Sequence, residues 1–254
     1  MAEKTRILAI HAHPDDIEIL AGGTMAKLAE RGHSLVLATM TAGDCGTREY
    51  DAETIAGIRK REAAASANLI GAEYLCAGFR DLVIFSDDVS RRRVTELLRV
   101  VRPRVVITAS PADYHCDHEA TSLLVRDACF AAGVPNYKTG DAPALDWIPH
   151  LYFMDPIEGV DRNGSPVHPD FGVDVGKQME MKREMLACHE SQREWLRKHH
   201  GIDDYIESMT QWTSSIGQRF RLPYAEGFRH YRVHPYPISE LLPALVGDVI
   251  IPAA

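Results

Sequence analysis

The sequence predicts an α/β fold with a mainly parallel sheet that is covered by helices on both faces. Short apolar runs recur through the first half of the 254-residue chain, and they are continuous rather than alternating. Each run is followed by a segment in which apolar residues recur at helical spacing. This alternation predicts parallel strands that are joined by right-handed crossovers.

The first strand and the first helix illustrate the pattern. The run RILAI at residues 6–10 predicts a buried strand. Apolar residues from Ile17 to Ala29 predict a helix that ends at Gly32, a common helix stop. The same reasoning predicts strands at residues 34–41, 73–77 and 104–110, and helices at residues 54–69, 90–101 and 119–132.

The second half of the chain is less regular, although we expect a single domain over residues 1–254. Its expected parts are a core at 1–134, an irregular substrate-side insertion at 135–175, and C-terminal helices with a tail at 176–254. Within these parts we expect a strand at 150–154 and helices at about 176–198 and 203–217. The apolar tail is expected to pack on the body or on a second copy in a homo-oligomer.

Composition and charge argue against several classes of function. The net charge is −8 and the longest basic run is Arg91 to Arg93, so a nucleic-acid-binding face is not expected. The five cysteines form no CxxC pair, which favours a reducing compartment. The sequence has no signal-peptide pattern and no run of roughly 18 apolar residues, so we expect a cytoplasmic protein without a membrane span.

Polar, ionisable loops follow each of the four predicted strands of the first half. These loops are HAHPDD, TAGDCGTR, GFRDL and SPADYHCDH in chain order. Because ligands of an open parallel sheet bind beyond the carboxyl ends of its strands, all four loops are expected at one edge. The sequence therefore predicts a site at that edge.

The first and fourth loops hold two clusters of residues that can bind a metal ion. The members are His13, Asp15 and Asp16 in the first loop and His115, Asp117 and His118 in the fourth. Imidazole and carboxylate groups without cysteine suit Zn²⁺ or another borderline divalent ion. A histidine at a strand end is often structural, and an aspartate before a helix is often an N-cap. Two such clusters at one sheet edge favour the functional interpretation.

Longer motifs around these clusters resemble a known family. AHPDDIEILAGGT and the later DYHCDH resemble the LmbE-like, or PIG-L, family of zinc-dependent N-acetylglucosaminyl de-N-acetylases. TAGDCGT, IRKREAAASANLIGA, GFRDL, KREMLACHESQ and YAEGFR extend the resemblance over most of residues 5–230, with its weakest part at about 135–175. The resemblance implies a Rossmann-like, three-layer α/β/α fold with the active site at the carboxyl ends of the strands.

The resemblance also implies a role for each site residue. His13, Asp16 and His118 match the ligands of one Zn²⁺ ion per chain, although another divalent ion would also suit them. Asp15 matches the general base, and His115 with its carboxylate partner Asp117 matches the group that assists the oxyanion or the leaving amine. Arg59 and Asp81 match substrate-contacting positions. The implied substrate is a small N-acylated amino sugar or glycoconjugate.

These roles agree with the chemistry of amide hydrolysis. Zinc lowers the pKa of a bound water to about 7, and a neighbouring carboxylate can take the proton of that water. We expect His115 to act in its protonated form, with Asp117 raising its pKa, although a nearby zinc ion would oppose that shift. Arg59 offers a fixed fork of donors for a polar group of the substrate.

Two other interpretations remain open at this point. His13, Asp15 and His118 also fit the facial triad of a non-haem Fe(II) oxygenase, although Asp16 and Asp117 would then lack a role. A non-catalytic sugar-binding protein of the same fold would not need a general base. Outside the site, we expect Gly22 and Gly23 to allow close helix packing, and His189, His199 and His200 to be surface or capping residues.

Overall fold

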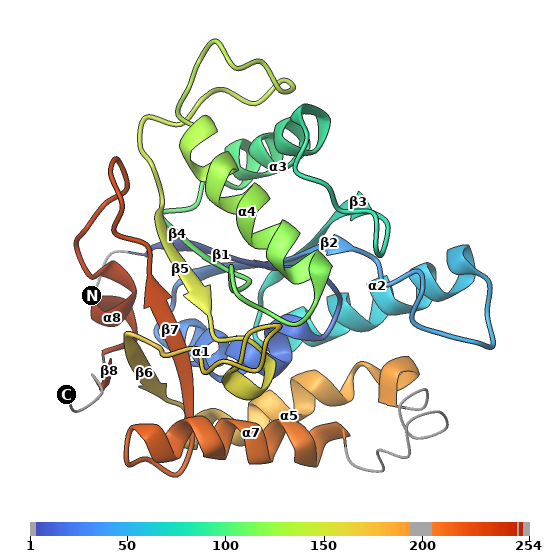
Figure 1. The fold of residues 1–254 in the computed structure, drawn as a ribbon, viewed down its shortest axis with the longest axis vertical. Coiled ribbons are helices and arrows are strands. Elements are labelled where there is room, and N and C mark those ends of the chain that lie inside the picture. The colour runs from blue at the N-terminus through green and yellow to red at the C-terminus, as the bar shows by residue number, and fades with distance from the viewer. Residues whose placement is uncertain (1–3, 194–204, 248, 251–254) are drawn as a thin grey trace.

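One eight-stranded sheet runs through the protein, whose computed structural model describes residues 4–193, 205–247 and 249–250 (Figure 1). The strand order is β3-β2-β1-β4-β5-β7-β6-β8. Five strands are parallel to one another, namely β1 (Arg6–His11), β2 (Ser34–Thr41), β3 (Glu73–Phe79), β4 (Val105–Thr108) and β5 (His150–Met154). The predicted parallel strands are therefore confirmed, with shifts of a few residues at their ends.

The other three strands extend the sheet by antiparallel pairing. They are β6 (Phe171–Asp174), β7 (Ala225–His230) and β8 (Val249–Ile250), and β7 lies between β5 and β6. None of the three was predicted. β6 and β8 are short, and β7 has no clear apolar pattern, so their pairing depends on partners that are distant in the sequence.

Helices cover both faces of the sheet and form three layers (Figure 1). Along β1, Ile7 and Ala9 belong to one apolar cluster, while Leu8 and Ile10 belong to the other, because successive side chains point to opposite faces. The first cluster packs under α1 (Asp16–Glu30), α2 (Ala52–Leu69), α5 (Met179–Ala187), α7 (Tyr205–Arg219) and α8 (Leu241–Val246). The second packs under α3 (Asp88–Val101) and α4 (Cys116–Ala131). The predicted fold class is confirmed.

Two helix boundaries differ from the prediction in ways that affect the site. α4 begins at Cys116, so Asp117 and His118 lie in its first turn rather than in the preceding loop. The helix expected at 176–198 begins as a 3₁₀ turn, Gly176–Gln178, continues as α5 and is interrupted at Cys188 and His189. It is helical again at 190–193, and the remainder, to residue 198, lies outside the described residues.

The expected packing of the glycine pair and of the tail is confirmed where the chain is described. A Cβ atom on Gly23 would lie 2.7 Å from the Cβ of Val175, so only glycine fits here without displacement. Leu242 and Val246 of α8 are fully buried in the first apolar cluster, although residues 251–254 lie outside the described part. Among the described helices, none is long and apolar enough to span a membrane.

Candidate active site

The turn between β1 and α1 presents two adjacent aspartates in different directions. Asp15 precedes α1 with φ 99°, a left-handed conformation that is uncommon for a residue with a side chain. Asp15 occupies the N-cap position, but its side chain makes no capping hydrogen bond, so capping does not account for this carboxylate. Asp16 instead closes the turn, because its Oδ2 accepts from the backbone N–H of His13 at 2.7 Å.

Three histidines surround the carboxylate of Asp16. Its Oδ2 atom lies 2.6 Å from Nδ1 of His11 and 3.4 Å from Nδ1 of His13. Its Oδ1 atom lies 3.5 Å from Nε2 of His118. His11, Asp16 and His118 form one buried group of possible metal ligands, and His13 lies beside it. The structure thus brings the three predicted ligands together and adds His11, which was not predicted to be a site residue.

A further carboxylate lies behind each of two histidines. Asp113 Oδ1 is 3.0 Å from Nδ1 of His118, and Asp117 Oδ2 is 3.1 Å from Nε2 of His13. Carboxylates in this position fix the tautomer and the orientation of a metal-binding imidazole. They leave Nε2 of His118 and Nδ1 of His13 directed toward Asp16. Asp113 was not predicted, although it stands five residues before His118 in the same motif.

The expected pairing of Asp117 with His115 is not present. The carboxylate of Asp117 contacts His13 and accepts from the backbone N–H of Leu82 at 2.8 Å. His115 is the N-cap of α4, and its Nδ1 accepts from the backbone N–H of Asp117 at 3.2 Å. Burial and the neighbouring His118 and His13 lower the pKa of His115, which is opposite to the direction expected from a carboxylate partner.

The environments of the adjacent aspartates move their pKa values in opposite directions. Burial raises the pKa of Asp15, and the charge of Asp16 adds to this effect against the pull of Arg59. Burial would also raise the pKa of Asp16, but His11 and His118 hold it well below its usual range. Such a divergence separates a carboxylate that can exchange a proton from one that stays ionised.

Two side chains from distant helices hold the carboxylate of Asp15. The hydroxyl of Tyr205 in α7 donates to Asp15 Oδ2 at 2.5 Å, and Nη2 of Arg59 in α2 lies 3.5 Å from the same oxygen. Arg59 also donates to the carbonyl of Pro14 at 2.7 Å. Gly43, with φ 74°, lies so close that a Cβ atom there would overlap the guanidinium. The contacts of Arg59 are thus with the protein, although it also lines the cavity.

Asp81 lies on the other side of His13. Its Oδ2 accepts from the backbone N–H of Cys45 at 2.8 Å, and its Oδ1 is 3.9 Å from Nε2 of His13. The side chain is buried, and Oδ1 accepts no hydrogen bond from the described residues. This oxygen is therefore an available acceptor at the wall of the site.

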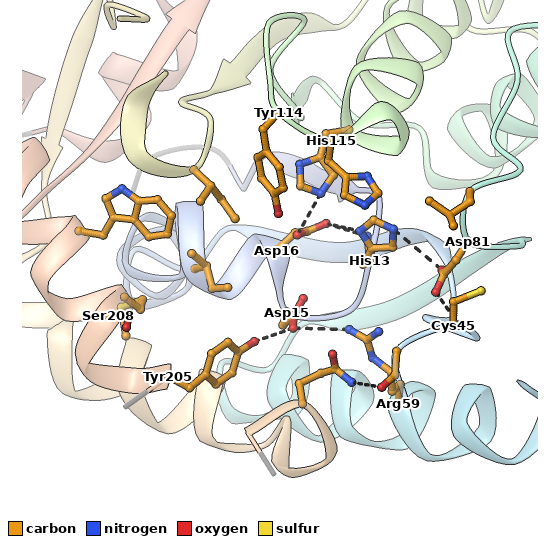
Figure 2. Close-up of a pocket in the computed structure, with 18 residues that line it drawn as sticks. His13, Asp15, Asp16, Cys45, Arg59, Asp81, Tyr114, His115, Tyr205 and Ser208 are labelled. Atoms are coloured by element: carbon orange, nitrogen blue, oxygen red, sulfur yellow. Dashed lines mark hydrogen bonds and ion pairs between the residues drawn. The ribbon is translucent and has the colours of Figure 1, made fainter. Parts of the chain in front are cut away.

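These residues border a cavity of about 500 Å³ (Figure 2). Of the eight predicted site residues, seven line it, and Asp117 lies behind His13. The lining residues that the sequence did not single out include Ile19, Tyr114, Ile157, Gln192, Tyr205, Ser208, Met209 and Trp212. Four of them recur on α7 at helical spacing, but a stripe of this kind does not distinguish a cavity wall from ordinary core.

His189 was predicted to be a surface or capping residue; it is not at the surface, and it directly precedes the helical residues 190–193. It is fully buried, and its Nε2 lies 3.1 Å from Glu18 Oε1, which also accepts from the hydroxyl of Ser66 at 2.6 Å. His199 and His200 lie outside the described residues. The interruption after α5 thus directs a histidine into the protein, where it connects the C-terminal helices to α1 and α2.

Comparison with known proteins identifies the family. The sequence profile of the PIG-L family, described as GlcNAc-PI de-N-acetylase, matches residues 8–129. A diacetylchitobiose deacetylase of Thermococcus kodakarensis is 31% identical over 194 residues, which cover 74% of this chain and 70% of the relative. The N,N'-diacetylchitobiose deacetylase structure from Pyrococcus horikoshii has a TM-score of 0.75 at 25% identity, covering 94% of this chain and 89% of that one. The chain belongs to the PIG-L, or LmbE-like, family.

One similar protein is named for a different reaction. The 4-oxalmesaconate hydratase of Pseudomonas putida is 25% identical over 189 residues, which cover 71% of each chain. Similarity over most of the chain therefore occurs with deacetylases and with a hydratase. Overall similarity therefore does not distinguish the two reactions, and the distinction depends on the side chains that line the cavity.

Proposed function

We propose that this protein is a zinc-dependent hydrolase that removes an N-acyl group, N-acetyl in the simplest case, from an amino sugar or its conjugate. The observation that supports this most is the pair Asp15 and Asp16. One carboxylate is surrounded by histidines and held ionised, and the other lies in the cavity with a raised pKa. A metal-assisted hydrolysis can use such a pair, with the ionised carboxylate as a metal ligand and the other as the general base.

The donor set fits a catalytic zinc ion. Nδ1 of His13, Nε2 of His118 and the carboxylate of Asp16 would hold it, which leaves a position open toward the cavity. His11 contacts Asp16 on its other side and would fix the ligand carboxylate. When bound, zinc would act as a Lewis acid and would make water a stronger nucleophile at neutral pH.

Asp15 would serve as the base and then as the acid. Its carboxylate takes one proton of the attacking water while the water oxygen bonds to the amide carbon. The same proton passes to the nitrogen when the C–N bond breaks, so the products are a carboxylic acid and an amine. Tyr205 and Arg59 hold the carboxylate toward the cavity for both transfers.

His115 would stabilise the negative oxygen of the tetrahedral intermediate as a neutral donor. Its Nδ1 accepts from a backbone N–H, so the neutral ring carries its proton on Nε2. A second proton on Nδ1 would remove this hydrogen bond, because a protonated nitrogen cannot accept one. His115 would thus act as a neutral hydrogen-bond donor and not in the protonated form expected from the sequence.

The charge of the cavity favours a deacylase over a hydratase that acts on polycarboxylates. Among the described lining residues, Asp15, Asp16 and Asp81 are acidic, and the single guanidinium, Arg59, contacts Asp15 and a backbone carbonyl. A polycarboxylate would need additional cationic side chains, and the described lining offers no lysine and no second arginine, whereas a neutral amide needs none. The iron triad that includes Asp15 is disfavoured, because the carboxylate among the histidines belongs to Asp16. Elemental analysis distinguishes iron from zinc at His13, Asp16 and His118, because two histidines and one carboxylate can bind either metal.

The test is a substrate panel with the zinc-loaded protein. N-acetylglucosamine, its β-linked dimer and N-acetylglucosaminides with varied aglycones are assayed for release of acetate together with one equivalent of free amine. Release that depends on zinc supports the proposal. Failure to cleave any amide, together with hydration of an unsaturated polycarboxylate, would overturn it in favour of hydratase chemistry.

A further inference from the structure

The cavity continues beyond the aspartates along one face of α7. Tyr205, Ser208, Met209 and Trp212 all line it, and their spacing of three, four and seven residues places them on one helix face. Tyr205 contacts Asp15, so this face begins at the reacting centre and leads away from it. Of these four residues, only Tyr205 has a role in the proposed hydrolysis.

Two isoleucines from other elements add apolar surface to the lining of the cavity. Ile19 stands one helical turn after Asp15 on α1, and Ile157 belongs to the short 3₁₀ turn Ile157–Gly159 after β5. Ile19, Ile157 and Trp212 are only half-buried although they line the cavity. Apolar surface of this kind favours a ligand that displaces water from it.

The two ends of the cavity differ in chemistry (Figure 2). Asp81 and Cys45 lie at one end, Tyr205 and Ser208 lie at the other, and Asp15 is between them. At the first end, Asp81 Oδ1 is a buried acceptor without a donor among the described residues. That end suits a hydroxylated or amine-bearing group, since polar groups need hydrogen-bonding partners when they leave water.

Resting on the proposed function, we infer that the α7 end is a subsite for an acyl chain longer than acetyl. An amide has its amine on one side of the reacting carbon and its acyl group on the other. If the sugar amine occupies the Asp81 end, the acyl group extends along Ser208, Met209 and Trp212. A methyl group would leave the half-buried Ile19, Ile157 and Trp212 in contact with water, whereas a chain of several methylenes covers them.

The experiment is a series of N-acylglucosamines that carry acetyl, butyryl, hexanoyl and octanoyl groups, each assayed for kcat/KM with the zinc-loaded protein. Burial of each methylene predicts a rise of about fourfold per methylene until the wall is covered. Ser208→Trp should reduce the ratio of octanoyl to acetyl turnover at least about tenfold, because the indole occupies the subsite. Gln211→Trp is the matched control, since Gln211 is exposed on α7 and outside the cavity.

The outcomes separate this inference from the proposed function. Hydrolysis of the acetyl compound with a flat or falling chain-length series overturns the acyl subsite and leaves the deacetylase proposal standing. Failure to cleave any member of the series or any N-acetylglucosaminide of the substrate panel, with zinc bound, overturns both. If Ser208→Trp alters selectivity among aglycones but not among acyl chains, the apolar end binds the amine side, and the acyl assignment is wrong.

Discussion

At the scale of single residues, the adjacent aspartates Asp15 and Asp16 lie in different surroundings. Their separation depends on the left-handed backbone at Asp15, which directs two neighbouring carboxylates into different surroundings. Such a conformation costs of order 1–3 kcal/mol and persists when the surrounding structure holds it. Here the contacts of Asp15 with Tyr205 and of Asp16 with the histidines hold both side chains.

Substitution of each aspartate should separate base from ligand. Asp15→Asn should keep its zinc and lose about 10²–10⁴-fold in turnover, because it can no longer exchange a proton. Asp16→Asn should lose zinc and activity together. Elemental analysis and acetate release measure the two properties. Zinc loss in Asp15→Asn with full occupancy in Asp16→Asn would show that the two roles are reversed.

Tyr205 is expected to act through Asp15. Tyr205→Phe removes the hydroxyl that donates to the carboxylate, and a hydrogen bond to a charged group contributes about 1.5–3 kcal/mol. Turnover should therefore fall about tenfold or more at constant zinc occupancy, with the thermal midpoint measured as a control for folding. Unchanged kcat and kcat/KM would mean that Asp15 is positioned by Arg59 alone.

Asp155 should make stability depend on pH. It follows β5, is buried, and its carboxylate oxygens accept no hydrogen bond from the described residues. Burial raises its pKa to about 7, against the pull of Arg229 and Arg219. The folded state therefore keeps a proton that the unfolded state loses above pH 4, so this group lowers stability as the pH rises from about 4 to 7.

Asp155→Asn should remove that dependence. Relative to the parent, the free energy of unfolding of the variant should rise by up to roughly 4 kcal/mol between pH 4 and pH 8. Urea titrations of both proteins at the two pH values give the free energy of unfolding of the variant relative to the parent at each pH. A difference that stays constant with pH would show that Asp155 is ionised in the folded protein at both values.

At the scale of elements, a buried ion pair joins three of them around the glycine pair of α1. Nζ of Lys182 in α5 lies 2.6 Å from Glu226 Oε1 in β7, and Glu226 also accepts from the backbone N–H groups of Gly23 and Thr24 in α1. Both charged side chains are about 1% exposed. The pair therefore connects the C-terminal helices to α1, the helix that begins at Asp16.

Breaking this pair on one side should be more harmful than removing it completely. Lys182→Met leaves a buried carboxylate without its cation and should lower the free energy of unfolding by about 3–5 kcal/mol. Lys182→Met combined with Glu226→Gln should recover much of that loss, because no uncompensated charge remains. Denaturant unfolding of both variants tests this. Equal losses in the two would show that packing, not charge, dominates.

At the scale of the whole molecule, zinc would connect segments that are distant in the chain. His13 follows β1 and His118 lies in α4, while the supporting Asp117 is 104 residues from His13. Removal of zinc should therefore lower the thermal midpoint as well as abolish activity, and zinc at a hundredfold excess over its Kd contributes about 2.7 kcal/mol. Calorimetry before and after chelation and reloading measures the effect. An unchanged midpoint with restored metal would contradict a site formed by these segments.

Local patterns in the sequence determined the parallel half of the fold and the chemistry of its edge. Continuous apolar runs define buried strands, and the carboxyl ends of parallel strands must share an edge, so the histidine and aspartate loops were predicted to meet. Seven of the eight predicted residues line one cavity.

Only the tertiary structure decided which groups pair inside that edge. Tyr205 reaches Asp15 across 190 residues of sequence, Asp117 contacts His13 rather than His115, and β7 inserts between β5 and β6. Such contacts leave no local pattern, because periodicity records which face of an element is buried and not which partner covers it. The partner is decided by how the packed layers bring distant side chains within hydrogen-bonding distance.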